Sequence, residues 1–307
     1  MTEHGAGPAI HSGRRTRTLM VQVLVALAPV CVAAVWRHGA DALMLLGLAI
    51  ATAWVLDAIC DRQQALDGSA VLTGLLVALM LPITAPWWAA VGGSALAILV
   101  GKHAFGGLGK NPFNPAALGL AVMMGVAPSV FLKPEWEVDG ISHATPLSTE
   151  LGSSAPALGG MVLGEASVAL GEAAPLALIA GGILLIGLRT IDFRMPLVYL
   201  AAVSVCALLL PAGARMEGHA PWLEGDPLLQ LFGGGALLAA FFIVTDPVTT
   251  PFSRPGRLIF CVLAAGYAML LRYYTPYPDG VLLGVLLANA SVPFIDKVTQ
   301  GEISGRQ

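Results

Sequence analysis

Long apolar segments recur along this chain from about residue 19 to residue 295, and few of them contain a charge. Segments this uniformly hydrophobic must be buried in one another or in lipid. Charged residues make up only 11% of the sequence, against about 25% in soluble globular proteins. So few charges cannot cover a globular surface. The sequence therefore predicts a polytopic membrane protein whose main solvent is the lipid bilayer.

The apolar sequence divides into ten runs, separated by charges and turn residues. They cover residues 19–36, 42–56, 69–81, 87–101, 115–132, 175–188, 195–210, 228–244, 258–271 and 280–295. The runs are continuously apolar and rich in Leu, Ala and Gly, which favours helices over strands. Several are shorter than the ~20 residues of an ordinary spanning helix. We predict an all-α polytopic membrane protein with about ten transmembrane helices, some of them interrupted.

The distribution of Lys and Arg predicts the orientation. With the N-terminus inside, twelve of the sixteen basic residues fall on the inner side, as cytoplasmic loops require. The expected order is a cytoplasmic tail (1–18), a five-helix half (19–132), an extracytoplasmic segment (133–174), a second five-helix half (175–296) and a second cytoplasmic tail (297–307). We expect the chain in a bacterial inner membrane, with residues 133–174 in the periplasm.

The two halves carry an internal repeat with an offset of 165 residues. Pro82–Trp87 aligns with Pro247–Phe252, Asn114 aligns with Asp279, and Gly119 aligns with Gly284. Because each half has an odd number of spans, matching loops fall on opposite faces, as in inverted-topology repeats with interrupted third helices. Interrupted helices at corresponding positions point to a buried site. The alternative, that Gly and Pro only permit close helix packing, stays open.

Several function classes are excluded by what the sequence lacks. The net charge is −3 and there is no basic run, so nucleic-acid binding is not expected. The four cysteines are scattered singly, which does not suggest a metal site. Motifs of hydrolases and nucleotide-binding loops are absent. No ionisable residue lies in the middle of a predicted span, which argues against an autonomous proton relay.

Polar, proline-rich loops at predicted helix ends are the candidate binding elements. On the inner side they contain Asn111, Asn114, Asp246, Thr249 and Thr250. Unpaired backbone N–H groups at helix starts, together with such side chains, can hold a polar ligand. For Asn114, which precedes Pro115, simple N-capping of a helix is an equally good reading.

The predicted extracytoplasmic segment contains the stretch Asp139-Gly140-Ile141-Ser142-His143-Ala144-Thr145. It resembles the acceptor motif at which a flavin transferase joins FMN to threonine through a phosphoester bond. A local turn stabilised by the Ser and Thr hydroxyls is the alternative for such a short motif.

Taken together, this motif between two five-span halves and the stretches PFNPAALG, TDPVTTPFSRPG and YPDGVLLGVLLAN resemble the NqrB/RnfD family. Its members are membrane flavoprotein subunits of the sodium-pumping NADH:quinone reductase and of the Rnf ferredoxin:NAD oxidoreductase. The resemblance covers about residues 15–298, and the short N-terminal tail is more similar to the RnfD branch. One position departs from the family pattern, which usually has Gly where this chain has His143.

The resemblance implies two flavins. The first is FMN, bound covalently to Thr145 at the outer face, with Asp139, Ser142, His143 and Tyr277 as candidate neighbours. The second is a noncovalent flavin, riboflavin in relatives, on the inner side. Its candidate contacts are the inner loop residues Asn111, Asn114, Asp246, Thr249 and Thr250, whose amides and hydroxyls suit an uncharged ring and ribityl chain.

These features predict an electron-transfer subunit that is not catalytic alone. Its expected partners are the A, B, C, E and G subunits of the Rnf complex, with a flavin transferase for maturation. Two alternatives stay open from the residues: a channel or transporter for a small neutral solute, and a structural membrane subunit without flavin.

Overall fold

The computed structural model describes residues 16–62, 66–132, 135–138, 141–144, 158–165, 168–210, 225–275 and 280–299. Helices occupy most of each of the ten predicted apolar runs. Four of them are long and apolar enough to cross a membrane: Thr16–Cys60, Trp87–Phe105, Arg254–Tyr274 and Val281–Thr299. Four shorter apolar helices accompany them. The chain is a helical membrane protein.

The first five runs form a compact group of helices. α1 (Thr16–Cys60) covers the first two runs and bends at Gly39, whose φ of 61° is a left-handed conformation that favours glycine. Then come α2 (Ser69–Met80), α3 (Trp87–Leu96), the π-helix η2 (Ala97–Lys102) and the 3-10 turn η3 (His103–Phe105). α4 (Pro115–Val126) and α5 (Ser129–Leu132) complete this part.

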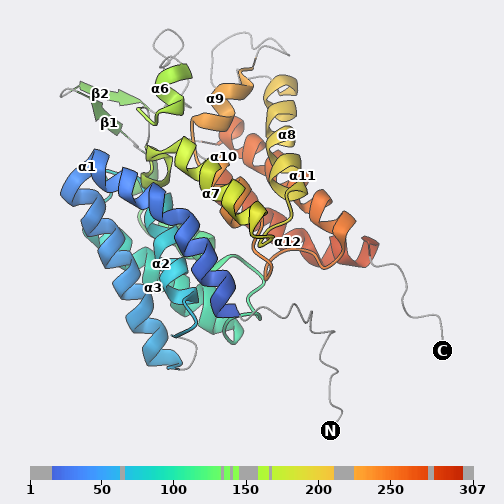
Figure 1. Cartoon of the computed structure of the whole chain (residues 1–307), viewed down its shortest axis with the longest axis horizontal. Coiled ribbons are helices and arrows are strands. Elements are labelled where there is room, and N and C mark those ends of the chain that lie inside the picture. Colours follow the sequence, from blue (N-terminus) through green and yellow to red (C-terminus); the bar gives the residue numbers. More distant parts are fainter. Residues whose placement is uncertain are drawn as a thin grey trace.

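The segment between the two groups includes a small β-hairpin, which the all-α prediction did not contain. β1 (Glu135–Val138) pairs antiparallel with β2 (Ile141–Ala144), so that Val138 faces Ile141. The dipeptide between them in sequence, Asp139-Gly140, is typical of hairpin turns. α6 (Leu158–Val162) and the 3-10 turn η5 (Leu170–Ala173) follow. Figure 1 shows the hairpin and α6 at the end of the molecule where α1 bends.

Two contacts attach this segment to the first group of helices. At the bend of α1, Arg37 Nη1 donates a hydrogen bond of 2.8 Å to the Leu163 carbonyl. Beyond the short helix α2, Pro82 forms a β-bridge with Ala169, flanked by hydrogen bonds from Ile83 N to Val168 O and from Leu170 N to Leu81 O. The backbone that α2 leaves unpaired is thereby satisfied inside the protein, as irregular backbone at membrane depth requires.

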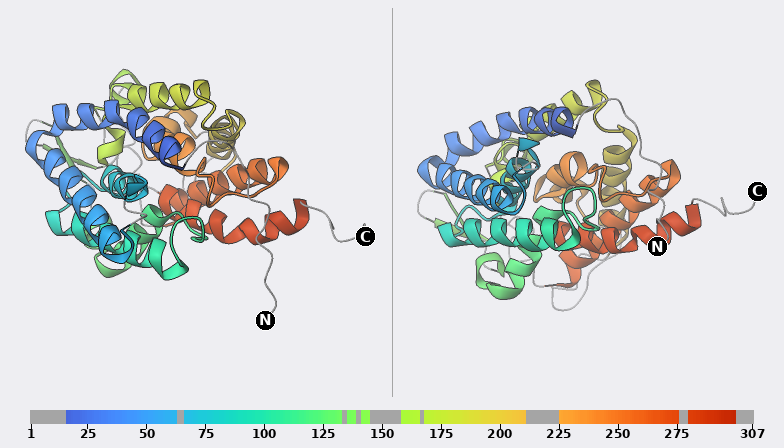
Figure 2. Two further views of the ribbon diagram at one scale, coloured as in Figure 1. Left: turned by 60° about the horizontal axis from the view of Figure 1, so that its bottom comes forward. Right: turned by 90° about the horizontal axis from the view of Figure 1, so that it is seen from below.

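The last five runs form the second group. It contains α7 (Pro175–Gly187), α8 (Arg194–Leu209), α9 (Pro227–Phe232), α10 (Ala236–Leu238), the π-helix η7 (Ala239–Ile243), α11 (Arg254–Tyr274) and α12 (Val281–Thr299). α9 and α10 are separated by Gly233-Gly234-Gly235, so the run predicted at 228–244 is broken. α12 packs against α11 and, across the groups, against α4, and Figure 2 shows α4 and α12 side by side.

A matched close packing occurs in each group. A Cβ added to Gly119 in α4 would lie 2.4 Å from Ala97 N, and one added to Gly284 in α12 would lie 2.5 Å from Ala268 N. The two glycines are the pair aligned by the 165-residue offset. Each allows the last long helix of its group to approach the helix before it at backbone distance.

Candidate functional site

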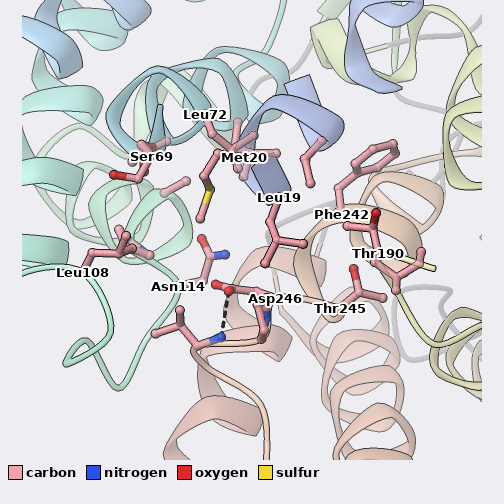
Figure 3. A pocket seen from close by; sticks show the side chains of 18 of the residues that line it. Leu19, Met20, Ser69, Leu72, Leu108, Asn114, Thr190, Phe242, Thr245 and Asp246 are labelled. Atoms are coloured by element: carbon pink, nitrogen blue, oxygen red, sulfur yellow. Dashed lines mark hydrogen bonds between the residues drawn. The ribbon is translucent and has the colours of Figure 1, made fainter. Parts of the chain in front are cut away.

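A pocket lies where the two groups of helices meet (Figure 3). The start of α1, the start of α2 and the loop into α4 form one side, and the end of α7, η7 and the loop after η7 form the other. Its cavity volume is about 90 Å³, room for roughly six to nine water molecules. The walls are mainly apolar, with Leu72, Leu76, Phe241 and Phe242 among them. Asn111, Asn114 and Asp246 bring polar groups from both sides.

The loop before α4 is held by its own asparagines. Asn111 Oδ1 accepts from Gly109 N at 3.2 Å, and Asn111 Nδ2 donates to the Phe113 carbonyl at 3.0 Å. Asn114 Oδ1 accepts from Ala117 N at 3.2 Å, so this side chain caps α4. Capping is therefore a real role of Asn114, and its amide is left to face Asp246 in the pocket.

The loop after η7 is organised around Asp246. Its Oδ1 accepts from Val248 N at 3.0 Å, and its Oδ2 accepts from Thr249 Oγ1 at 3.3 Å. Thr250 Oγ1 donates to the Asp246 carbonyl at 2.9 Å. Of the five predicted inner-site residues, Asn111, Asn114 and Asp246 line the pocket, whereas Thr249 and Thr250 lie behind it and hold the Asp246 turn.

Burial of the Asp246 carboxyl dominates its electrostatics. Desolvation raises the pKa of Asp246 above its ordinary value, and hydrogen bonds from Val248, Thr249 and Asn114 lower it in part. A carboxyl with a raised pKa keeps its proton to higher pH and can then donate a hydrogen bond as well as accept one. Among the polar groups that line the pocket, this one can change its charge.

Asn289 joins the two loops and was not singled out from the sequence. This buried α12 residue accepts from Asn114 N at 3.1 Å through Oδ1 and donates to the Thr249 carbonyl at 3.0 Å through Nδ2. One side chain thus fixes the relative position of the loop before α4 and the loop after η7. Its place in an apolar helix, with no polar neighbour in sequence, was the available signal.

The expectation that no ionisable side chain lies in the interior is wrong. Asp57, in the last turns of α1, is fully buried and forms an ion pair with Lys102, at 2.8 Å from Lys102 Nζ to Asp57 Oδ1. Lys102 is itself 1% exposed and sits in the π-helix η2. Arg272 in α11 is also buried and donates to Gln230. Sequence position alone assigned these residues to span edges, because the fold that buries helix ends in loops cannot be read from hydropathy.

Comparison with known proteins places this architecture. The model of the NQR2, RnfD, RnfE family matches residues 4–305, almost the whole chain. The chain belongs to this family.

Curated relatives agree with the family and share one name, the D subunit of the ion-translocating oxidoreductase complex. The chain is 35% identical over 355 residues to this protein from Klebsiella pneumoniae (strain 342), with 98% of each chain covered. It is also 35% identical over 351 residues to the protein of that name from Yersinia enterocolitica, and 34% identical over 354 residues to that of Salmonella arizonae, with the same coverage.

The residues predicted for the outer flavin are only partly described. In β2, Ser142 is the register partner of Glu137, and His143 is the partner of Trp136. Thr145 follows β2 directly in sequence, and it lies outside the described residues, as do Asp139 and Tyr277. The acceptor motif therefore begins on a short strand in the segment attached to the bend of α1.

Proposed function

We propose that this chain is the membrane subunit of an Rnf-type ion-translocating ferredoxin:NAD oxidoreductase and that it carries electrons across the bilayer. The observation that carries the proposal is the pocket between the two groups of helices, in a chain of the NQR2, RnfD, RnfE family whose relatives are named as the D component of such a complex. The A, B, C, E and G subunits of that complex are the proposed partners, and a flavin transferase is the proposed maturation enzyme.

Two carriers are proposed, because the apolar core of a bilayer is about 30 Å thick. FMN esterified to Thr145 would serve the outer side, near the β2 strand. A noncovalent flavin, with riboflavin as the proposed species, would lie in the pocket on the inner side. When bound, the flavins supply reversible electron transfer, while the protein supplies placement and electrostatics.

The residues of the inner pocket fit part of a flavin. Aromatic and aliphatic walls formed by Leu72, Phe241 and Phe242 suit the flat apolar faces of a ring system. Polar groups at Asn114 and Asp246 suit its hydrogen-bonding edge. The volume of about 90 Å³ is smaller than a whole flavin needs, so we expect the rest of the ligand to lie along the open side of the pocket. Thr249 and Thr250 would act indirectly, by holding Asp246.

Ten membrane crossings in two inverted five-helix halves are the proposed topology. The helix bounds, the break between α9 and α10, the short α2, and the matched packing of Gly119 on Ala97 and of Gly284 on Ala268 all support it. We propose cytoplasmic termini and a periplasmic segment 133–174 in a bacterial inner membrane. Without the buried Lys102 and Arg272, the basic residues still divide eleven to three in favour of the inner side.

The proposal is tested by flavin fluorescence. The full chain is expressed with a flavin transferase, denatured and run on a gel beside Thr145→Ala and His143→Gly. We expect a fluorescent band from the parent, none from Thr145→Ala, and a band at least as strong from His143→Gly, which restores the usual family residue. Acid extraction of the native Thr145→Ala protein should still release one noncovalent flavin.

A parent without covalent flavin, although the transferase modifies another substrate, would contradict the outer carrier. A native protein that releases no flavin would contradict the inner one. Loss of both would leave the solute channel and the structural subunit as the remaining readings.

A further inference from the structure

The buried ion pair continues into a hydrogen-bonded chain between the protein surface and the pocket. His103 Nε2 lies 2.7 Å from Asp57 Oδ1. Asp57 Oδ2 accepts from Lys102 Nζ at 2.9 Å, and Lys102 Nζ donates to Ser69 Oγ, also at 2.9 Å. Ser69 is the first residue of α2 and lines the pocket (Figure 3). Four side chains from α1, α2, η2 and η3 thus form one connected path.

The two ends of this path differ in exposure. The His103 side chain is 18% exposed, whereas Asp57 is 0% and Lys102 is 1% exposed. Because an ionised carboxylate only accepts, His103 Nε2 carries the hydrogen toward Asp57. Within the part of the chain that the structure describes, His103 Nδ1 has no protein partner and is left to water. Ser69 Oγ accepts from Lys102, so its own hydrogen is available to an acceptor in the pocket.

A purely structural role does not account for this arrangement. Moving two opposite charges into an apolar interior costs more than a well-packed apolar pair of the same size. The same end of the molecule could be fastened by ordinary packing, as Gly119 and Gly284 fasten other helices. The π-helix η2 carries Lys102 in its last turn, and π-helical turns are frequent at functional sites.

We propose that His103, Asp57, Lys102 and Ser69 form a proton path that delivers one proton from the cytoplasmic solution to the inner pocket when the ligand there gains an electron. The inference rests on the proposed function. His103 and Ser69 are the terminal residues of the path, and Asp57 and Lys102 are the residues between them.

The step balances as one proton for one electron. The electron comes from the preceding carrier of the complex, and the proton comes from water at His103 Nδ1. The Ser69 hydroxyl gives its proton to the reduced ligand and takes one from Lys102 Nζ. Lys102 takes one from Asp57, and Asp57 takes the Nε2 proton of His103. His103 then returns to its starting form with the water-derived proton, so every group in the path ends as it began.

The test uses the full chain with Thr145→Ala, so that the pocket flavin is the one flavin in the sample. A light flash in the presence of an electron donor reduces it, its bleaching is followed by absorbance, and a pH-indicator dye in weak buffer follows proton uptake. We compare the ratio of the uptake rate to the bleaching rate among variants. In the parent we expect uptake to keep pace with bleaching.

Two variants interrupt the path at different ends. His103→Gln keeps a hydrogen-bond donor for Asp57 but cannot relay a proton, and Ser69→Ala removes the last hydroxyl without touching the ion pair. We expect each to lower the rate ratio about a hundredfold, the low end of the effect of a positioned proton carrier. Added imidazole should restore the ratio in His103→Gln and not in Ser69→Ala, because only the former break is reachable from solution. His38→Gln, at the opposite end of α1, is the matched control.

An unchanged ratio in His103→Gln or in Ser69→Ala, in protein that holds its flavin and keeps the parent unfolding temperature, would overturn the path. Equal rescue of both variants by imidazole would overturn it too, because a merely structural loss is not distinguished by position. A Thr145→Ala chain without flavin would instead refute the proposed function itself, so the two failures are distinct.

Discussion

Asn114 shows how one side chain serves both folding and the site. Its oxygen caps α4 through Ala117 N, and its amide faces Asp246 from the other group of helices. The capping could be predicted, because Asn followed by Pro is typical of a helix start. Its position opposite Asp246 could not, since 132 residues separate the two in sequence and only the tertiary packing brings them together.

Asp246 gives the pocket a dependence on pH. Folding raises its pKa, so the folded state binds this proton more tightly than the unfolded state, whose value is near 3.8. The stabilisation that this proton provides is complete below pH 3.8 and is lost as the pH rises through the folded pKa. The change is about 1.4 kcal/mol for each pH unit between the two pKa values.

We therefore expect Asp246→Asn, which keeps an oxygen for Val248 N and Thr249 Oγ1 but cannot ionise, to lack this decline. Thermal unfolding of both proteins in detergent, at a series of pH values from 4 upward, measures it. The variant should gain stability relative to the parent as the pH rises, until the folded carboxyl is ionised. Parallel curves for the two proteins would contradict the raised pKa.

Asn289 is the residue whose loss should disturb both loops together. Asn289→Ala leaves Asn114 N and the Thr249 carbonyl unpaired in the interior, and each such group costs about 1–3 kcal/mol. We expect a lower unfolding temperature and loss of the noncovalent flavin. Ser291→Ala is the control in the same helix, because its exposed hydroxyl bonds only to the Leu287 carbonyl. A stable Asn289→Ala protein with full flavin content would show that the loops hold themselves.

At the scale of elements, the helices agree closely with the apolar runs, while their breaks and bends needed the structure. The run at 228–244 is divided at three glycines, and the two runs at 19–36 and 42–56 are joined into one bent helix at Gly39. Hydropathy detects apolar length well, because burial in lipid or protein demands it. The π-helices η2 and η7 leave no hydropathy signal, since they widen a turn without changing its composition.

The packing of the last helix of each group depends on one glycine. Adding a methyl group at Gly119 or at Gly284 forces it against the backbone of Ala97 or Ala268. We expect Gly119→Ala and Gly284→Ala each to cost about 1–3 kcal/mol of stability. Gly125→Ala in α4 and Gly266→Ala in α11 are matched controls, because a methyl group there meets nothing within 4 Å. These two should be neutral or slightly stabilising.

Differential unfolding temperatures of the four variants measure the effect. If Gly284→Ala were as mild as Gly266→Ala, the close contact between α11 and α12 would not matter for stability. A strong effect at Gly119 alone would argue that the two halves are not packed alike.

At the scale of the whole molecule, membrane character and family membership could be predicted from composition and from a few motifs. The meeting of the inner loops in one pocket was anticipated only in part, through the repeat that assigned them to one face. The buried pair of Asp57 and Lys102 could not be predicted, because the two residues are 45 positions apart and each lies near the end of an apolar run. Charge counting then assigned Lys102 to the solvent-facing side.

The proposed orientation can be checked in whole cells by cysteine labelling. In a chain with its four cysteines replaced, Glu165→Cys and Arg17→Cys each offer one exposed thiol. We expect a membrane-impermeant maleimide to label position 165 once the outer membrane is opened, and position 17 only after the inner membrane is broken. Labelling of position 17 first would reverse the topology and move the pocket to the periplasmic side.

The joining of the two inner loops by Asn289 also has a consequence for biogenesis. Asn289 is on the last helix, and the pocket needs residues from α1 as well as from η7. During synthesis, no partial chain that lacks α12 has both loops in place, so the inner ligand can be loaded only after the final helix has left the ribosome. Insertion of that cofactor is then a completion signal, and a chain truncated before α12 is born empty whatever the supply of flavin in the cell.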